Sequence, residues 1–143
     1  MPTKNKAFLS LDEDFQPIVW DILVSLELKG WQPTVVEGRR TIEQQKEKVR
    51  RGVSKTMKSY HLSGNAADIC DVRYMWNISN VHPFWWALYQ AAKKVPIENG
   101  RLRCGIIWDH PEREAIYKKA LDEKKPALVN WFADVAHVEI HWD

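Results

Sequence analysis

Glycine and proline residues divide this chain into short segments, and that division limits its fold more than any other feature of the sequence. In some segments the apolar residues recur every three or four positions, as on one face of a helix. In others they alternate with polar residues, as in a strand. The two kinds of segment are mixed without the regular strand–helix–strand alternation of a doubly wound sheet. The pattern therefore predicts an α+β domain.

Four segments have the apolar spacing and the end signals of helices. We expect Asp14 to cap the first, while Thr41 and Gln44 form the Thr-x-x-Gln pattern of a capping box at the start of the second. Pro83 and Pro111 lie in the first turns of the third and fourth, where a missing N–H is tolerated. The predicted helices cover residues 15–29, 41–51, 82–95 and 111–123.

Four further segments are predicted as strands because they are short, apolar and bounded by turn residues. The last of them is the most informative, since its alternation places His137, Glu139 and His141 on one face and apolar residues on the other. The predicted strands cover residues 31–38, 66–72, 101–108 and 136–142.

Composition excludes several classes of protein. The 143 residues suit one domain, predicted over residues 1–143, and 21 basic against 19 acidic residues leave a net charge of +2, too small to indicate nucleic-acid binding. No segment is apolar over the roughly 18 residues that a membrane span needs, and no signal peptide is evident. We therefore expect a chain made in the cytoplasm, without membrane insertion. Its two cysteines, Cys70 and Cys104, are expected to be reduced and buried.

The stretch SYHLSGNAADICD raises the question of a metal site. His61 precedes Asp68 by seven positions, and a flat strand would point two residues at an odd spacing to opposite faces. A turn at Gly64 removes that obstacle by folding the histidine back beside the start of the strand. On spacing alone, the two residues are either a pair of metal ligands or an unrelated loop histidine and strand-end aspartate.

A second candidate half-site lies near the C-terminus. Asp134 stands three residues before His137, so a turn into the strand would bring its carboxylate beside a metal held by the imidazole. A zinc hydrolase needs three protein ligands, an open position for water and a carboxylate that handles protons. Glu139 is expected to orient a ligand from behind, and His141 is either a fourth ligand or merely exposed.

These residues carry a family resemblance. The pattern S-x-H-x-x-G-x-A-x-D over residues 59–68 resembles the first zinc motif of the D-alanyl-D-alanine and L-alanyl-D-glutamate metallopeptidases, which cleave peptidoglycan. The D-x-x-H of residues 134–137 resembles the second motif of the L-alanyl-D-glutamate branch, found in phage endolysins. A third block, VVEGRRTIEQQKEKVRRGVSKTMKSYHLSG, resembles that branch's Arg-Ser/Thr element, Gln-bearing helix and Gly-x-Ser-x-Thr loop. The match covers about residues 31–73 and 102–142.

The resemblance implies a fold and a metal. The family shares its fold with lysostaphin-type peptidases and the hedgehog signalling domain, so a small antiparallel sheet carrying a zinc site and flanked by helices is expected. His61, Asp68 and His137 would be the ligands of one Zn²⁺ per chain, and Asp134 would be the general base.

The resemblance also implies a substrate site. Arg40 would hold a substrate carboxylate or polarise the scissile carbonyl, although its neighbour Arg39 makes that assignment liable to slip by one residue. Ser59 and Trp108 would contact substrate, and Glu139 would support a zinc ligand.

The resemblance implies an endolysin-like peptidoglycan hydrolase that cleaves the L-alanyl-D-glutamate bond of stem peptides. Such an enzyme is expected to be a monomer that reaches the wall after a separate pore-forming protein releases it. One alternative is a D,D-carboxypeptidase or dipeptidase acting on terminal D-Ala-D-Ala, which would release D-alanine alone. Another is a zinc-containing wall-binding module without catalysis, although the base, ligands and arginine are all present.

One region departs from the family pattern. The family often has a Trp-Gly-Gly-Asp-Trp segment before its last motif, whereas this chain has CGIIWDH, which keeps only Trp108 and Asp109 at its end. The following segment, Pro111–Asn130, is an insert that we expect to reshape one wall of the cleft. His110 beside it is a candidate for the cleft lining, and His82 is expected to cap a helix or to lie on the surface.

Overall fold

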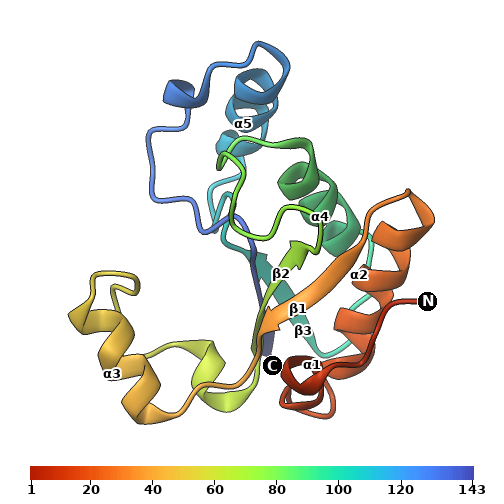
Figure 1. The fold of residues 1–143 in the computed structure, drawn as a ribbon, viewed down its shortest axis with the longest axis vertical. Coiled ribbons are helices and arrows are strands. Elements are labelled where there is room, and N and C mark those ends of the chain that lie inside the picture. The colour runs from red at the N-terminus through yellow and green to blue at the C-terminus, as the bar shows by residue number, and fades with distance from the viewer.

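Four antiparallel strands form one sheet in the computed structural model, which describes residues 1–143 (Figure 1). Their spatial order is β1-β2-β4-β3, so the last strand of the chain lies between the second and the third. The strands are β1 (Pro33–Glu37), β2 (Ala66–Asp71), β3 (Gly100–Cys104) and β4 (His137–Trp142). This order places the two predicted half-sites on adjacent strands, and the α+β prediction is confirmed.

The register of β4 decides which side chains share a face of the sheet. Asp68 of β2 lies opposite His137, and Arg103 of β3 lies opposite Glu139. Residues directly opposite each other in an antiparallel pair project from the same face. One face therefore gathers polar and charged groups, and the other gathers apolar ones such as Val138.

Helices α2 (Gln16–Leu28) and α4 (Pro83–Lys93) contact each other, and α2 contacts β1 while α4 contacts β3 (Figure 1). Their buried side chains join those of the sheet in one apolar cluster. Burying each Leu, Ile or Phe side chain contributes roughly 1.5–3 kcal/mol to the stability of the fold. This cluster therefore stabilises the sheet from one face, and the opposite face carries the polar residues. Fully buried members include Val19, Ile22, Leu23, Leu26, Ile69, Phe84, Trp85 and Leu88.

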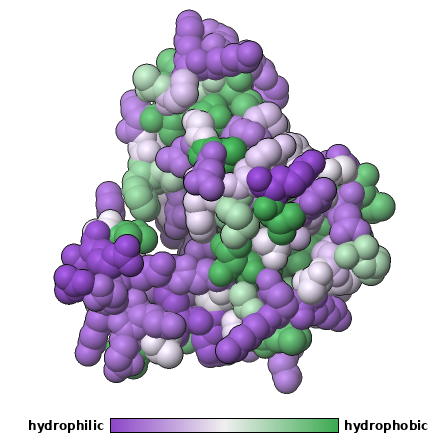
Figure 2. All heavy atoms as spheres, in the orientation of Figure 1, coloured by the Kyte–Doolittle hydropathy of each residue, from purple (hydrophilic) through white to green (hydrophobic).

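Helix α3 (Ile42–Arg50) extends away from the sheet as an arm (Figure 1). Its capping box is confirmed: the Gln44 backbone N–H donates to Thr41 Oγ1 at 3.1 Å, and the Thr41 backbone N–H donates to Gln44 Oε1 at 2.8 Å. Hydrophilic residues cover this arm in Figure 2, and Gln45 is the one buried residue of the helix. The arm is therefore held by polar contacts.

The predicted insert forms α5 (Glu112–Asp122) and the short 3-10 helix η2 (Pro126–Leu128). Tyr117 anchors α5, since its ring stacks on Trp86 at 6.0 Å between centroids and its hydroxyl donates to the Asn80 carbonyl. The insert is thus packed against the α4 region.

Some local predictions were wrong. The first predicted helix corresponds to α2. Its N-cap is Phe15, without a side-chain hydrogen bond, so Asp14 does not cap it. Strand β3 ends at Cys104, and residues 105–109 form turns where a strand was predicted. The short helix α1 (Lys6–Leu9), capped by Asn5, was not predicted because it is only one turn long.

The predictions for the two cysteines and for His82 held. Cys70 and Cys104 are both buried and unpaired, and burial raises the pKa of each thiol to about 12. His82 caps α4 by accepting a hydrogen bond from the Phe84 backbone N–H at 3.0 Å. None of the helices has the length and apolar character needed to cross a membrane.

Candidate metal centre

A left-handed glycine brings His61 back over β2. The 3-10 helix η1 (Tyr60–Ser63) carries the histidine and ends at Gly64, whose φ is +75°. A Cβ at this position would lie 2.7 Å from the backbone nitrogen of Asp12, so both conformation and space require glycine. The odd spacing between His61 and Asp68 is thereby compatible with one site, because the histidine does not lie on the strand.

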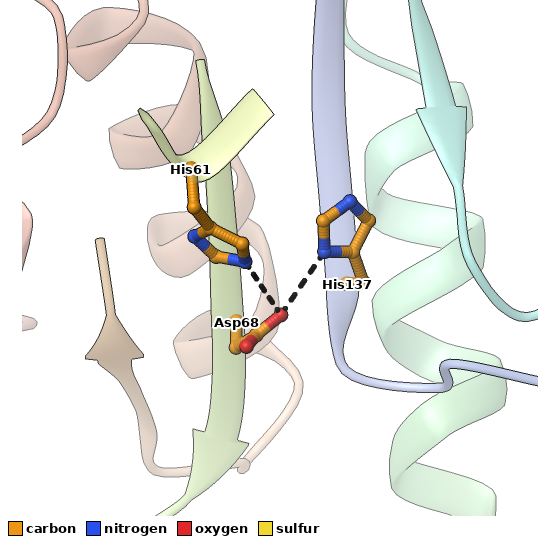
Figure 3. Close-up of side chains that lie close together, drawn as sticks. All are labelled: His61, Asp68 and His137. Carbon is orange, nitrogen blue, oxygen red and sulfur yellow. Dashed lines mark hydrogen bonds and ion pairs between the residues drawn. The ribbon is translucent and has the colours of Figure 1, made fainter. Parts of the chain in front are cut away.

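His61, Asp68 and His137 converge at the polar face of the sheet (Figure 3). Asp68 Oδ1 lies 3.4 Å from His61 Nε2 and 3.2 Å from His137 Nδ1, so the carboxylate sits between two imidazoles. All three residues are buried, with exposed fractions of 1%, 5% and 6% respectively. One ligand atom from each lies within 4.8 Å of the others, which is compact enough to surround a metal ion.

The donor set fits a cation. His61 Nδ1–H donates to the Gly38 carbonyl at 2.6 Å, which leaves a lone pair on Nε2. That buried nitrogen has no hydrogen-bond partner and faces a carboxylate oxygen, which is also an acceptor. Two acceptors cannot satisfy each other, whereas a cation between them satisfies both. The group could therefore hold a metal ion.

The charges of the site support the same arrangement. Burial by itself would raise the pKa of Asp68, but the neighbouring His137 imidazole holds that pKa well below its usual range. Burial would lower the pKa of His137, yet its contacts with Asp68 and Glu139 raise it to about 10. The metal-free site is thus a carboxylate paired with a protonated imidazole, and a metal ion would take the place of that proton.

Glu139 contacts His137 on the side of the imidazole ring away from Asp68. His137 Nε2–H donates to Glu139 Oε1 at 2.7 Å, so the nitrogen that faces Asp68 is Nδ1. The other oxygen of Glu139 accepts from His141 Nε2–H, and the Tyr60 hydroxyl bonds to His141 Nδ1 at 3.2 Å. His141 thus contacts Glu139 and Tyr60 and lies outside the group of three residues that could hold a metal ion.

Asp134 lies beside His61, Asp68 and His137, at the start of the turn that leads into β4. The predicted turn is present, since the His137 backbone N–H donates to the Asp134 carbonyl at 3.1 Å, and Asp134 Oδ2 lies 3.8 Å from His137 Nδ1. Burial and the charge of Asp68 raise the pKa of Asp134. The Asp134 side chain is partly exposed at the cleft, which leaves it accessible to a bound water.

Arg40 lies on the other side of Asp68 and is held by its own partners. Its Nε–H donates to Glu37, and one Nη1–H donates to Gln45 Oε1 at 2.8 Å. Its Nη2 lies 3.7 Å from Asp68 Oδ2, and Nη1 lies 3.4 Å from Ser59 Oγ. Arg39 instead bonds to Ser10, outside the site, so the geometry favours Arg40 over its neighbour.

An open cleft of about 450 Å³ leads to these residues. Ser59 and Trp108, the expected substrate contacts, both line this cleft, and the Trp108 ring lies 5.5 Å from the His137 ring. His110 lies outside the cleft lining, in contact with Glu112.

Several residues of the site were not identified from the sequence. Gln45 supports Arg40 and also donates to Ser54 Oγ at 2.8 Å; the family pattern indicated a glutamine on this helix but not which one. The alternation of β4 placed His141 on the same face as His137, but it did not predict the contact between His141 and Glu139. No sequence signal pointed to Tyr60, or to the basic residue Arg113 in the cleft.

Comparisons with known proteins relate this chain to one family and to one solved fold. A sequence model of the family described as "Phage L-alanyl-D-glutamate peptidase" matches residues 7–140. Among solved structures, the chain is similar to the Serratia marcescens L-Ala D-Glu endopeptidase ChiX, with a TM-score of 0.54 and 20% sequence identity over 95% of this chain and 84% of that one. A comparison with curated protein sequences gives no significant match.

Proposed function

Because the chain belongs to the phage L-alanyl-D-glutamate peptidase family, we propose that it hydrolyses this bond in peptidoglycan stem peptides with one zinc ion bound by His61, Asp68 and His137. The observation that carries the proposal is the convergence of three buried side chains that can bind a metal. One of their atoms, His61 Nε2, has no hydrogen-bond partner. Two imidazoles and one carboxylate are a typical ligand set for catalytic zinc, which keeps a further position open.

Zinc is favoured over harder cations because two of the three donors are imidazole nitrogens, whereas Mg²⁺ and Ca²⁺ prefer oxygen ligands. When bound, zinc would lower the pKa of a coordinated water and polarise the scissile carbonyl. Each imidazole is oriented by an oxygen acceptor, the Gly38 carbonyl for His61 and Glu139 for His137. Such contacts set the tautomer that presents a lone pair to the metal.

Asp134 is the general base of the proposed reaction. It takes a proton from the attacking water and passes it to the amine of the departing D-glutamate. In the metal-free protein, burial and the charge of Asp68 raise the pKa of Asp134. Arg40, held by Glu37 and Gln45, would bind the carbonyl oxygen or a carboxylate of the substrate, and Ser59 and Trp108 would contact the peptide.

The remaining assignments follow from the same proposal. We treat residues 1–143 as one catalytic domain that acts as a monomer on the wall, after release through a pore made by another protein. The D,D-carboxypeptidase alternative and the non-catalytic wall-binding alternative are outcomes of the following experiment.

The decisive experiment compares the parent with Asp134→Asn on purified cell wall. The parent should contain about one zinc per chain, release peptides with new N-terminal D-glutamate by mass spectrometry, and lose activity with a chelator. The variant should keep its zinc and lose about 10²–10⁴-fold in kcat/KM, because a positioned base contributes that much. Asp122→Asn, which changes an exposed residue of α5, is the matched control.

The outcomes separate the alternatives. Release of D-alanine alone would indicate the D,D-carboxypeptidase reading. A parent that binds zinc and wall without cleaving it would indicate a binding module, and full activity in Asp134→Asn would exclude the proposed base.

A further inference from the structure

The cleft contains basic side chains that the metal centre does not use. Lys55 and Lys58, in the loop after α3, and Arg113 of α5 all line the cleft. None of the three takes part in an ion pair of the structure. By contrast, Arg40 is paired with Glu37, and Arg103 with Asp109. The cleft therefore has a surplus of uncompensated positive charge.

Arg113 is the best positioned of these cations. Its guanidinium lies 4.9 Å from the centroid of the Trp131 ring, and Nη1 lies 3.5 Å from the Ile107 carbonyl oxygen. The indole is fixed in turn, because Trp131 Nε1–H donates to the Ile106 carbonyl at 2.9 Å. Stacking on a fixed indole orients the planar guanidinium while leaving most of its five N–H donors free.

The chemistry of the substrate indicates what those donors would bind. On the proposed function, the residue on the amine side of the scissile bond is glutamate. It has two carboxyl groups, and the next peptide bond can use only one of them. A free carboxyl therefore remains beside the reacting bond, and further carboxylates can follow along the peptide. A guanidinium is matched to a carboxylate by two parallel hydrogen bonds.

We propose that Arg113, held on Trp131, is a carboxylate-binding residue for the stem peptide, and that Lys55 and Lys58 add to the positive field of the cleft. This inference rests on the proposed function. It gives the insert Pro111–Asn130 a role, since the insert supplies Arg113 and leads directly into Trp131. The ligand is either the free carboxyl of the glutamate or a carboxylate farther along the peptide.

The test uses three synthetic peptides that contain the L-alanyl-D-glutamate bond. One has all carboxylates free, the second has the glutamate's free carboxyl as a primary amide, and the third has only its C-terminal carboxyl as an amide. For the first peptide, Arg113→Gln should raise KM about tenfold with kcat little changed, because a charge-assisted hydrogen bond is lost in both ground and transition states. Arg113→Lys, which keeps the charge without the planar fork, should fall between parent and Arg113→Gln.

The amide whose KM is insensitive to Arg113→Gln identifies the carboxylate that Arg113 binds. Lys119→Gln removes one positive charge from the exposed surface of the same helix and should leave KM unchanged for all three peptides. Thermal unfolding of each variant would show whether the fold is intact. An equal change, or no change, for all three peptides in a folded Arg113→Gln would overturn this subsite alone. A parent that cleaves none of them would overturn the proposed function and the subsite with it.

Discussion

Both ring nitrogens of His137 contact a buried carboxylate. Its Nδ1 faces Asp68 at 3.2 Å, while its Nε2–H is held by Glu139 at 2.7 Å. Glu139 also accepts from His141, so the two oxygens of one buried carboxylate hold two imidazoles. The orientation of the His137 imidazole therefore depends on Glu139, which contacts the ring nitrogen that does not face Asp68.

Substitution of Glu139 tests that dependence. Glu139→Gln keeps the size of the side chain but removes the negative charge next to His137 Nε2. The imidazole then becomes a weaker ligand for the metal. We expect zinc affinity to fall about 10–100-fold, the usual cost of losing such a partner, as measured by competition with a chromophoric chelator. Glu112→Gln, an exposed acid at the start of α5, is the control. Equal affinities in parent and Glu139→Gln would show that Glu139 has no part in metal binding.

At the scale of elements, the turn after β3 and the turn before β4 position each other. The Gly105 backbone N–H donates to the His137 carbonyl at 2.8 Å, and the Asp134 N–H donates to the Gly105 carbonyl at 3.0 Å. A Cβ on Gly105 would overlap the Asp134 carbonyl and lie 2.8 Å from its Cβ. Gly105 lies in the CGIIWDH segment, and this close backbone approach explains why a glycine is needed there.

Gly105→Ala is therefore expected to move Asp134 away from the metal centre. The clash is with backbone, so it cannot be relieved by a side-chain rotation. We expect kcat to fall by at least about tenfold, since small displacements of a catalytic group are costly, with bound zinc retained. Peptide hydrolysis and metal content of the same preparation would measure both. An active Gly105→Ala enzyme would mean that the two turns can separate without consequence.

The sequence predicted these elements unequally. Helix α3 was predicted well because its capping box is a contact between residues three positions apart. Strand β4 was predicted because alternation alone reveals its two faces. The predicted end of β3 was wrong because Ile106 and Ile107 are apolar and β-branched, as strand residues often are. In the structure both belong to a turn, and both side chains are buried. Burial of apolar residues does not distinguish those two backbones.

At the scale of the whole molecule, the metal centre links the two halves of the chain. His61 and Asp68 come from the first half and His137 from the last strand, and β2 pairs directly with β4. An ion that binds all three can bind only the folded chain, so it stabilises the fold by mass action. Behind the sheet, the apolar cluster of α2 and α4 stabilises the protein independently of metal.

Thermal unfolding with and without zinc tests this linkage. At free zinc about 100-fold above Kd the gain is about 2.7 kcal/mol, or roughly 5–10 °C in Tm for a chain of this size. Asp68→Asn should abolish most of the gain, whereas Lys46→Gln, on the exposed surface of α3, should not. A full zinc-dependent rise in Asp68→Asn would place the metal elsewhere.

The zinc-dependent gain should also increase with pH. In the metal-free protein the pKa of His137 is raised from 6.5 to about 10, so the stability from its protonation is complete below about pH 6.5 and is lost as pH rises through 10. Zinc has to displace that proton, and its apparent affinity therefore rises over the same interval. A zinc-dependent rise in Tm that is the same at pH 6.5 and pH 8.5 would contradict the protonated His137.

Local features could be predicted from the sequence: most of the helical and extended segments, the cap of α3, the polar face of β4, and motifs whose resemblance to a peptidase family pointed to His61, Asp68, His137 and Asp134. These depend on residues within a few positions of one another, or on order along the chain. That these residues meet follows only from the fold, since the pairing of β2 with β4 sets Asp68 opposite His137. It alone also set the imidazole tautomers, through Gly38 and Glu139, and brought Arg113 to the cleft. Contacts between distant segments have no spacing in the sequence, so packing and strand register had to supply them.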